Sequence, residues 1–214
     1  MGDYVTVRDF AQDEFVVKKS RFIGYSKHVE TEAEAMAFVA EISKKHWDAS
    51  HNVYAFSLRD GMTRRYSDDG EPQGTAGVPV LDVILKENIV DVCVVVTRYF
   101  GGILLGAGGL VRAYAQGSKV ALDAARVVTM HPTCRYAFDV EYSFVGKLDH
   151  WLLSQPVLVN EREFGVQVTY DVSVKKEDAV GFLKGLTQLS QGRLEPLLLE
   201  ESFSPWQETD SAGK

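Results

Sequence analysis

The sequence predicts an α+β protein with two domains. Three observations support this: helix-like and strand-like segments alternate in the first half, the pattern restarts near His131 and Pro132, and 214 residues suffice for two small domains. We place the domains at residues 1–131 and 132–201, and we expect a disordered tail at residues 202–214.

The first domain is expected to begin with two strands and a capped helix. Residues 15–18 and 22–28 have strand-like composition on either side of the basic turn KKSR. Thr31 then opens a helix, and Glu34, three positions later, completes a capping box. Residues 52–59 alternate enough to form the next strand.

The middle of this domain is expected to contain a loop, a short helix, a buried strand and a long helix. Residues 64–77, RRYSDDGEPQGTAG, have the composition of a loop. Pro79 suits the first turn of the short helix that follows. Residues 92–97 form a β-branched run without polar alternation, which is typical of a strand buried on both faces. The long helix is expected from Leu110 to about Arg126.

After the restart, the elements are expected in the order strand, helix, strand, strand, helix, strand. Strands are expected at residues 135–142, 157–160, 164–174 and 194–200, and helices near residues 145–153 and 176–190. The order βαββαβ is that of a ferredoxin-like sandwich, in which two helices cover one face of four strands.

Charge and hydropathy limit the classes of partner. The net charge is −7; residues 1–130 hold 15 Lys+Arg against 17 Asp+Glu, and residues 131–214 hold 8 against 13. A long non-specific nucleic-acid tract is disfavoured because phosphate contacts need clustered cations, but a local anion site is compatible with these numbers. No apolar run approaches the ~20 residues that span a bilayer, and the acidic start does not resemble a secretory signal. We therefore expect a cytoplasmic protein without a membrane partner.

The two cysteines give no sign of a metal or disulfide site. Cys93 and Cys134 stand far apart in apolar contexts, so we interpret them as buried thiols. Neither a metal nor a cofactor is expected.

A glycine-rich segment at residues 98–114, RYFGGILLGAGGLVRAY, lies at a predicted strand-to-helix junction. Glycine lets an anion approach backbone N–H groups at a helix N-terminus, because no Cβ intervenes. Close packing of the helix on the sheet explains the glycines equally well. The candidate contacts to an anion or nucleic acid are Arg98, Gly101, Gly102, Gly106, Gly108, Gly109 and Arg112, together with Lys18, Lys19 and Arg21.

Known phosphate-binding motifs do not match this segment. Val111 stands where the dinucleotide fingerprint requires its third glycine, and no Gly-Lys-Ser/Thr of the Walker pattern follows.

A second group of candidate residues is acidic. Asp68, Asp69 and Glu71 are close together in the sequence, and His51 is a candidate general base. An acidic Gly-Pro loop is most simply a solvated turn. The functional alternative is a cleft that these four residues form with the glycine-rich segment.

Four stretches taken together resemble one family, the YigZ/IMPACT proteins. They are residues 18–24, 49–56, 67–81 and 94–114. The resemblance implies a first domain similar to the second domain of a small-subunit ribosomal protein and to the fourth domain of elongation factor G, with a left-handed βαβ crossover. It implies a second domain similar to the fifth domain of elongation factor G.

The resemblance also implies a function. It favours a non-catalytic protein that binds RNA, the ribosome or a translation-factor protein and so regulates translation. The alternative is an enzyme that acts on a nucleotide or phosphorylated small molecule through the glycine-rich segment, as kinases of the same superfamily do. Leu110 and Val111 stand where those kinases have serines, so phosphoryl transfer is the second choice.

Overall fold

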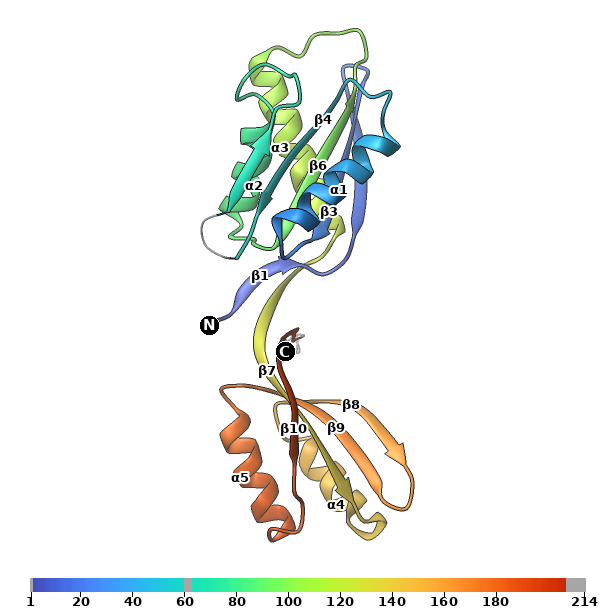
Figure 1. Cartoon of the computed structure of the whole chain (residues 1–214), viewed down its shortest axis with the longest axis vertical. Coiled ribbons are helices and arrows are strands. Elements are labelled where there is room, and N and C mark those ends of the chain that lie inside the picture. Colours follow the sequence, from blue (N-terminus) through green and yellow to red (C-terminus); the bar gives the residue numbers. More distant parts are fainter. Residues whose placement is uncertain (1, 60–62, 207–214) are drawn as a thin grey trace, which may run out of the picture. The chain divides into compact units, whose positions relative to one another are not determined.

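The chain divides into two compact units (Figure 1). The computed structural model describes residues 2–59 and 63–206. Tyr4–Thr129 form one unit, and the residues described from Met130 onward form the other together with Gly2 and Asp3. The division lies close to the boundary predicted after residue 131.

The first unit contains the expected elements and, in addition, two strands that were not predicted, at residues 4–7 and 64–67. In order, the elements are β1 (Tyr4–Val7), β2 (Ala11–Val17), β3 (Ser20–His28), α1 (Glu32–Lys45), β4 (His51–Ser57), β5 (Arg64–Ser67), α2 (Gly77–Lys86), β6 (Val92–Tyr99) and α3 (Ala107–Ala124).

Two predicted boundaries in this unit are wrong. Residues 64–67, predicted as loop, form β5, because they pair with β4 along its free edge and so gain backbone hydrogen bonds that composition does not reveal. Helix α3 begins at Ala107, three residues before the predicted Leu110, so Gly108 and Gly109 lie in its first turn instead of preceding it.

Helix α1 begins as predicted. The Thr31 hydroxyl accepts a hydrogen bond from the Glu34 N–H at 3.2 Å. The Glu34 carboxylate in turn accepts from the N–H of Glu30, one residue before the cap, at 2.8 Å. Both bonds satisfy N–H groups that a helix start would otherwise leave without an acceptor.

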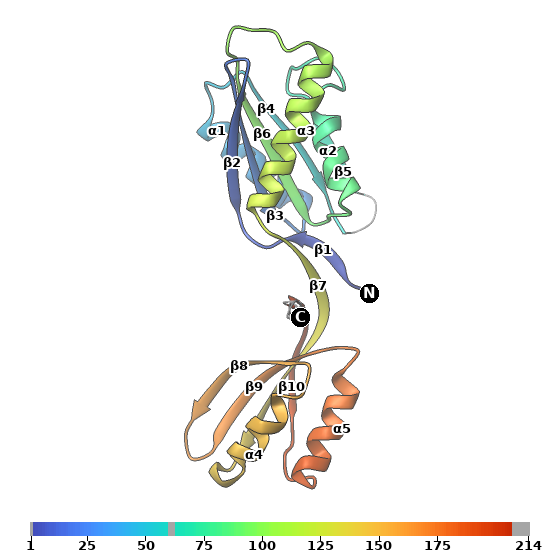
Figure 2. The same cartoon turned by 180° about the vertical axis from the view of Figure 1, so that it is seen from behind.

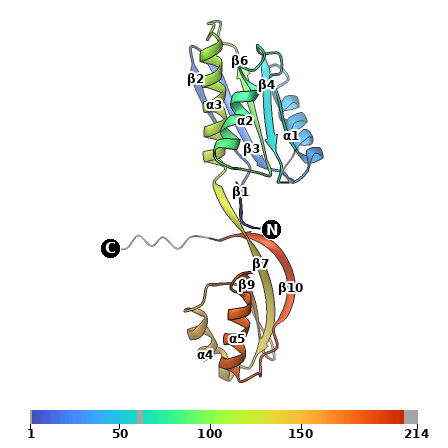
Figure 3. The same cartoon turned by 90° about the vertical axis from the view of Figure 1, so that its left-hand side faces the viewer.

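The sheet of this unit has the order β2-β3-β6-β4-β5 and is antiparallel throughout. Helix α1 covers the face seen in Figure 1, and α2 and α3 cover the face seen in Figure 2. Figure 3 shows the three layers from the side. Strand β6 is central: Val94 and Val96 pack toward α2 and α3, whereas Cys93 and Val95 pack toward α1. Its predicted burial on both faces is confirmed.

Helix α3 approaches the sheet closely at two glycines. A Cβ placed on Gly24 of β3 would lie 2.2 Å from the Gly117 carbonyl oxygen of α3. A Cβ on Gly117 would lie 2.6 Å from Cγ1 of Val96. These two glycines therefore set the distance between α3 and the sheet, and neither belongs to the glycine-rich segment.

The second unit has the predicted order of elements. They are β7 (Val127–Val140), α4 (Tyr142–Leu152), β8 (Val157–Phe164), β9 (Val168–Lys175), α5 (Ala179–Ser190) and β10 (Leu197–Pro205). Strand β7 pairs with both β9 and β10, and β9 pairs with β8, all antiparallel. One core joins α4 and α5 to the same face of β7 and β9 (Figure 3).

The prediction of a disordered tail is wrong for residues 202–206. Residues 202–205 continue β10, with Pro205 opposite Met130 of β7. The indole N–H of Trp206 then donates to the Thr133 hydroxyl at 3.0 Å. Pairing along the long strand β7 supplies backbone bonds to a segment whose composition suggested a tail. Residues 207–214 of the predicted tail lie outside the described residues.

The thiols of Cys93 and Cys134 are both buried and free, as predicted. Burial raises the pKa of Cys93 to about 12.

Candidate functional site

The alternation of side chains along the sheet brings three polar residues together at one end of the face that α3 covers. Two of them were predicted as site residues and one was not. His51 of β4 pairs with Arg98 of β6 across the sheet, and Phe22 of β3 pairs with Arg98 on the other side. Because side chains two apart point the same way, Ser20 shares the face of Phe22. His51, Arg98 and Ser20 therefore lie together, beneath the start of α3.

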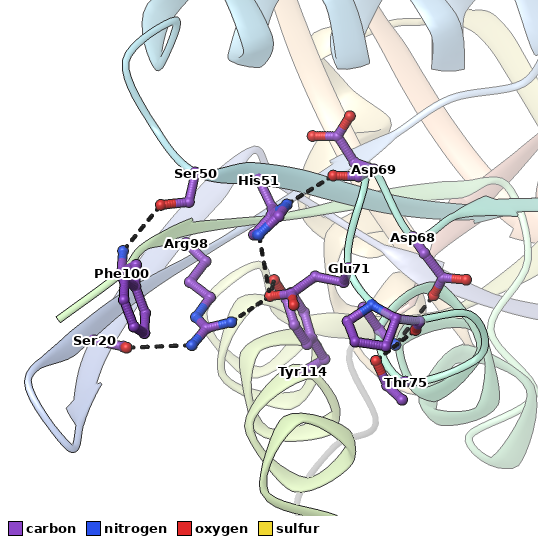
Figure 4. Close-up of polar contacts among 12 residues, drawn as sticks. Ser20, Ser50, His51, Asp68, Asp69, Glu71, Thr75, Arg98, Phe100 and Tyr114 are labelled. Carbon is purple, nitrogen blue, oxygen red and sulfur yellow. Dashed lines mark hydrogen bonds and ion pairs between the residues drawn. The ribbon is translucent and has the colours of Figure 1, made fainter. Parts of the chain in front are cut away.

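Glu71 is the centre of this group (Figure 4). Its Oε1 accepts from the Arg98 guanidinium at 2.5 Å and from the Tyr114 hydroxyl at 2.8 Å. Oε1 also lies 3.7 Å from Nε2 of His51. Glu71 is 9% exposed and Arg98 is 5% exposed. A charge buried to this degree requires a partner, and each of these two residues supplies it for the other.

Arg98 consequently differs from the exposed anion donor that the sequence suggested. Its second terminal nitrogen donates to the Ser20 hydroxyl at 3.4 Å, and Nε has no hydrogen-bond partner among the described residues. The guanidinium is therefore committed to the interior. Arg98 holds Glu71 in place rather than reaching toward an exposed ligand.

Tyr114 of α3 completes the group. Burial, followed by the charge of Glu71 and the hydrogen bond to it, raises the pKa of Tyr114, so the hydroxyl stays protonated and donates. The ring of Tyr114 is buried in the core between α3 and the sheet. Only the position of Glu71 in space reveals the role of the hydroxyl.

The acidic loop is held by the start of β4 and the start of α2. The His51 Nδ1–H donates to the Asp69 carbonyl at 2.8 Å, and the Asp69 carboxylate accepts from the Asn52 N–H at 2.5 Å. Asp69 adopts φ of +44° and Gly70 follows with φ of +83°, so the chain turns sharply there. Asp69 thus points away from Glu71 and fixes the ring of His51 through its main chain.

Asp68 caps helix α2 from a distance. Ala76, at the N-cap position, has no side chain able to accept a hydrogen bond. Asp68 replaces it: one carboxylate oxygen accepts from the N–H groups of Ala76 and Gly77 at 3.1 and 2.8 Å, and the other accepts from Gly74 at 2.9 Å. Asp68 is therefore a structural residue of the helix start.

This arrangement predicts a loss of stability in acid. Desolvation acts to raise the pKa of Asp68, but the three backbone N–H bonds outweigh it and lower the pKa below its ordinary value. The stabilisation is complete above the unfolded pKa and is lost as the pH falls through the lower folded pKa, below about pH 4. We expect Asp68→Asn to lower the free energy of unfolding by about 1 kcal/mol at pH 7 and to flatten its acid dependence. Urea unfolding from pH 7 to pH 3 measures both; parallel curves for the two proteins would contradict the assignment.

The N-terminus of α3 opens beside this group. Gly106 is the N-cap, with φ of +73° and no side-chain hydrogen bond. Its carbonyl accepts from the Leu110 N–H at 2.9 Å. In the described part of the chain no acceptor is found for the N–H groups of the three residues between them. The helix therefore presents free donors at its positive end.

A cleft joins these features. It has a volume of about 410 Å³, is open to solvent, and lies entirely within the first unit. Its polar lining comes from His51, Glu71, Arg98 and the start of α3, and its apolar lining from Pro72, Phe100, Leu104, Leu105 and Leu110. Of the predicted cleft residues, the structure brings His51 and Glu71 to it, but neither Asp68 nor Asp69 lines it.

The basic turn lies against the glycine-rich segment. Lys18 and Lys19 join β2 to β3, with φ of +44° and +66°. A Cβ on Gly101 would lie 2.1 Å from the Lys19 carbonyl carbon, and the Gly101 N–H donates to the Ser20 hydroxyl at 3.1 Å. Gly101 is therefore a packing glycine. It seats the lysine turn beside the cleft.

The predicted cations differ in their availability. Among the described residues, Lys18, Lys19 and Arg112 have no ion-pair or hydrogen-bond partner, and all three are exposed. Arg112 lies beside the first turn of α3, since a Cβ on Gly108 would be 3.7 Å from its guanidinium. Arg21, in contrast, is paired with Glu14 at 2.5 Å. The available cations at this end of the unit are thus Lys18, Lys19 and Arg112.

The glycines of the segment have different roles. Gly102, with φ of +80°, and Gly106 allow the chain to turn into α3. Gly108 and Gly109 belong to the first helical turn. The two interpretations of the glycines, packing and ligand approach, therefore apply to different residues.

The hydrogen-bonding roles of Ser20 and Ser50 were not predicted from the sequence. The Ser50 hydroxyl accepts from the Phe100 N–H at 3.1 Å and holds the residue that carries the exposed ring at the cleft mouth. Serines in loops are too common to single out, so only their hydrogen bonds identify them.

Two kinds of feature are absent from the described residues. No three His, Cys, Asp or Glu side chains there converge as metal ligands would. None of the described helices is both long and apolar enough to cross a bilayer.

Comparison with known proteins identifies relatives over nearly the whole chain. The model of the Impact N-terminal domain matches residues 18–122, and that of a domain of unknown function (DUF1949) matches residues 138–193. The IMPACT family member YvyE of Bacillus subtilis is 38% identical, over 90% of this chain and 89% of its own length. The IMPACT family member YigZ of Escherichia coli is 34% identical, over 86% and 92%.

A solved structure, whose title describes a hypothetical protein, is similar to this chain. It superposes with a TM-score of 0.59 at 31% identity, and the match covers 94% of this chain and all of that one. The chain therefore belongs to the IMPACT family, in the bacterial form that joins an Impact N-terminal domain to DUF1949.

Proposed function

We propose that this protein is a non-catalytic RNA-binding module that acts on the ribosome and regulates translation in the cytoplasm. One observation carries the proposal: the start of α3, whose first N–H groups are free, lines a cleft, and exposed cations lie on the neighbouring segments. Lys18 and Lys19 form the turn that packs against Gly101, and Arg112 lies beside Gly108 in the first turn of α3. A phosphate fits the positive end of a helix, and nearby cations attract the rest of the backbone.

The lysine turn supports this proposal. Two-residue turns with positive φ at both positions normally use Asn or Gly. Lys18 and Lys19 occupy such a turn here at a conformational cost of roughly 1 kcal/mol each. Strained residues cluster at functional sites, which is consistent with a need for two ammonium groups at this place.

The fold supports it by analogy. We propose that the first unit has the fold of the second domain of a small-subunit ribosomal protein, with its left-handed βαβ crossover, and of the fourth domain of elongation factor G. We propose that the second unit is a ferredoxin-like sandwich similar to the fifth domain of that factor. A shared fold supports a shared function less directly than the residues of the cleft do.

We expect Lys18→Gln, Lys19→Gln and Arg112→Gln, combined, to weaken binding of a single-stranded RNA oligonucleotide. The plot of log affinity against log salt should become shallower by about 0.7 for each phosphate that the variant no longer neutralises. Fluorescence anisotropy with labelled RNA, between low and moderate salt, measures the slope.

A matched control removes three cations from the other end of the same unit. Arg8, Arg64 and Lys86 are exposed and lie near the end of the sheet opposite the cleft. Their combined replacement by Gln should leave the slope nearer to that of the wild type. Equal losses of RNA affinity in both triple variants would mean that binding depends only on net charge. If the wild type does not bind RNA, the RNA-binding function is contradicted, and a translation-factor protein becomes the expected partner.

A second candidate function is an enzyme acting on a nucleotide or phosphorylated small molecule. The convergence of His51, Glu71 and Arg98 with the start of α3 in one cleft favours it. Thermal shifts with nucleotides, with and without Mg²⁺, separate the candidates: stabilisation that requires both components favours the enzyme.

A further inference from the structure

Two hydrogen-bond acceptors in the cleft lack a donor. Glu71 Oε1 is occupied by Arg98 and Tyr114, whereas no group in the described part of the chain donates to Oε2. Oε2 is not among the enclosed atoms left without a partner, so it opens toward the cleft that Glu71 lines. Oε2 of this mostly buried residue is therefore available to a donor that enters the cleft.

His51 supplies the second acceptor. Its Nδ1 must carry the proton, because its partner at 2.8 Å, the Asp69 carbonyl, can only accept. In the neutral ring, Nε2 is then an acceptor, and it lies 3.7 Å from Oε1 of Glu71. Both residues line the same cleft. A ligand with two neighbouring donors would satisfy both.

The wall of the cleft offers a surface for a planar group. Phe100 is 48% exposed, its N–H is held by Ser50, and its ring centroid lies 5.4 Å from the Arg98 guanidinium carbon. Leu104 is 81% exposed on the same cleft. Aromatic side chains fixed at the edge of a basic site are typical platforms for unstacked bases.

We propose that the cleft takes one unpaired guanine of an RNA strand, an inference that rests on the RNA-binding function proposed above. Among the four bases, guanine alone carries two adjacent donors, N1–H and the 2-amino group, on its Watson–Crick edge. These donate to Glu71 Oε2 and His51 Nε2, and the base lies against Phe100. A neighbouring phosphate lies at the start of α3, which lines the same cleft.

The test compares uridine oligomers that differ at one central nucleotide. We expect the oligomer with a central guanosine to bind about tenfold more tightly than those with adenosine, cytidine or uridine. Inosine, which keeps N1–H and lacks the 2-amino group, should lose part of this preference. Anisotropy titrations at one salt concentration give all five affinities.

Variants assign the preference to the cleft. His51→Gln should reduce the preference for guanosine while the affinity for the uridine oligomer changes little. Phe100→Ala should weaken binding of every oligomer, because stacking is tolerant of base identity. Glu71→Gln is informative only where circular dichroism shows that this variant is folded, because Glu71 also holds Arg98. If Glu71→Gln does not fold, His51→Gln still tests the proposal.

The two proposals fail in different ways. Equal affinity for all oligomers with a steep salt dependence would overturn the guanine site and leave RNA binding intact. Absence of binding to every oligomer would overturn RNA binding itself. A guanosine preference that persists in His51→Gln, together with unchanged affinities in Phe100→Ala, would place base recognition outside this cleft.

Discussion

Glu71→Ala is expected to destabilise the unit of residues 4–129 by about 3–5 kcal/mol. The Arg98 guanidinium, 5% exposed, would keep its charge in the interior without the carboxylate that accepts its hydrogen bond at 2.5 Å. The Tyr114 hydroxyl would lose its acceptor as well. Such a loss is a large share of the stability of an ordinary domain. Urea unfolding monitored by circular dichroism, with hydrogen exchange to assign the change to this unit, measures it.

The control removes both charges. In Glu71→Leu with Arg98→Met, no buried charge is left unpaired, so this double variant should be more stable than Glu71→Ala. A coupling free energy near zero between the two positions, measured by a double-mutant cycle, would show that the pair does not act as described.

Gly24→Ala is expected to cost about 2–3 kcal/mol of unfolding free energy. The new Cβ would lie 2.2 Å from the Gly117 carbonyl oxygen, which belongs to the backbone of α3 and cannot move aside as a side chain can. The helix would have to shift away from the sheet, and the packing between them would loosen. Chemical denaturation of the purified variant gives the value.

A glycine of helix α3 serves as the matched control for Gly24→Ala. A Cβ on Gly108 meets only the flexible end of Arg112, at 3.7 Å, and Ala is the better helix former. Gly108→Ala should therefore leave stability unchanged or raise it slightly. A similar destabilisation in both variants would point to glycine content in general and against the close contact between α3 and β3.

Local sequence was sufficient to predict several elements. The β-branched run of β6 and the Thr31 cap of α1 each depend on neighbours within a few residues, and the structure confirms both. The βαββαβ order of the second unit follows from hydrophobic periodicity for the same reason. The four motifs were long enough to predict the family, which the comparisons show.

Elements that depend on distant pairing were mispredicted. Strand β5 and the end of β10 exist because β4 and β7 offer them backbone partners, and composition carries no trace of such partners. Helix α3 begins three residues earlier than predicted. Glycines are poor helix formers, but they are tolerated in the first turn, where few helical hydrogen bonds have yet formed.

Residue types in the sequence were enough to predict which region carries the candidate site, since polar and glycine-rich motifs stand out against ordinary composition. Tertiary structure alone decided what each residue does there. Arg98 was expected to donate to a ligand, but it donates to Glu71. Asp68 was expected in the cleft, but it caps α2. Both differences arise because hydrogen bonds join groups that are close in space. The sequence shows which polar groups are present. The packing of the sheet and helices determines which of these groups contact one another and which line the cleft.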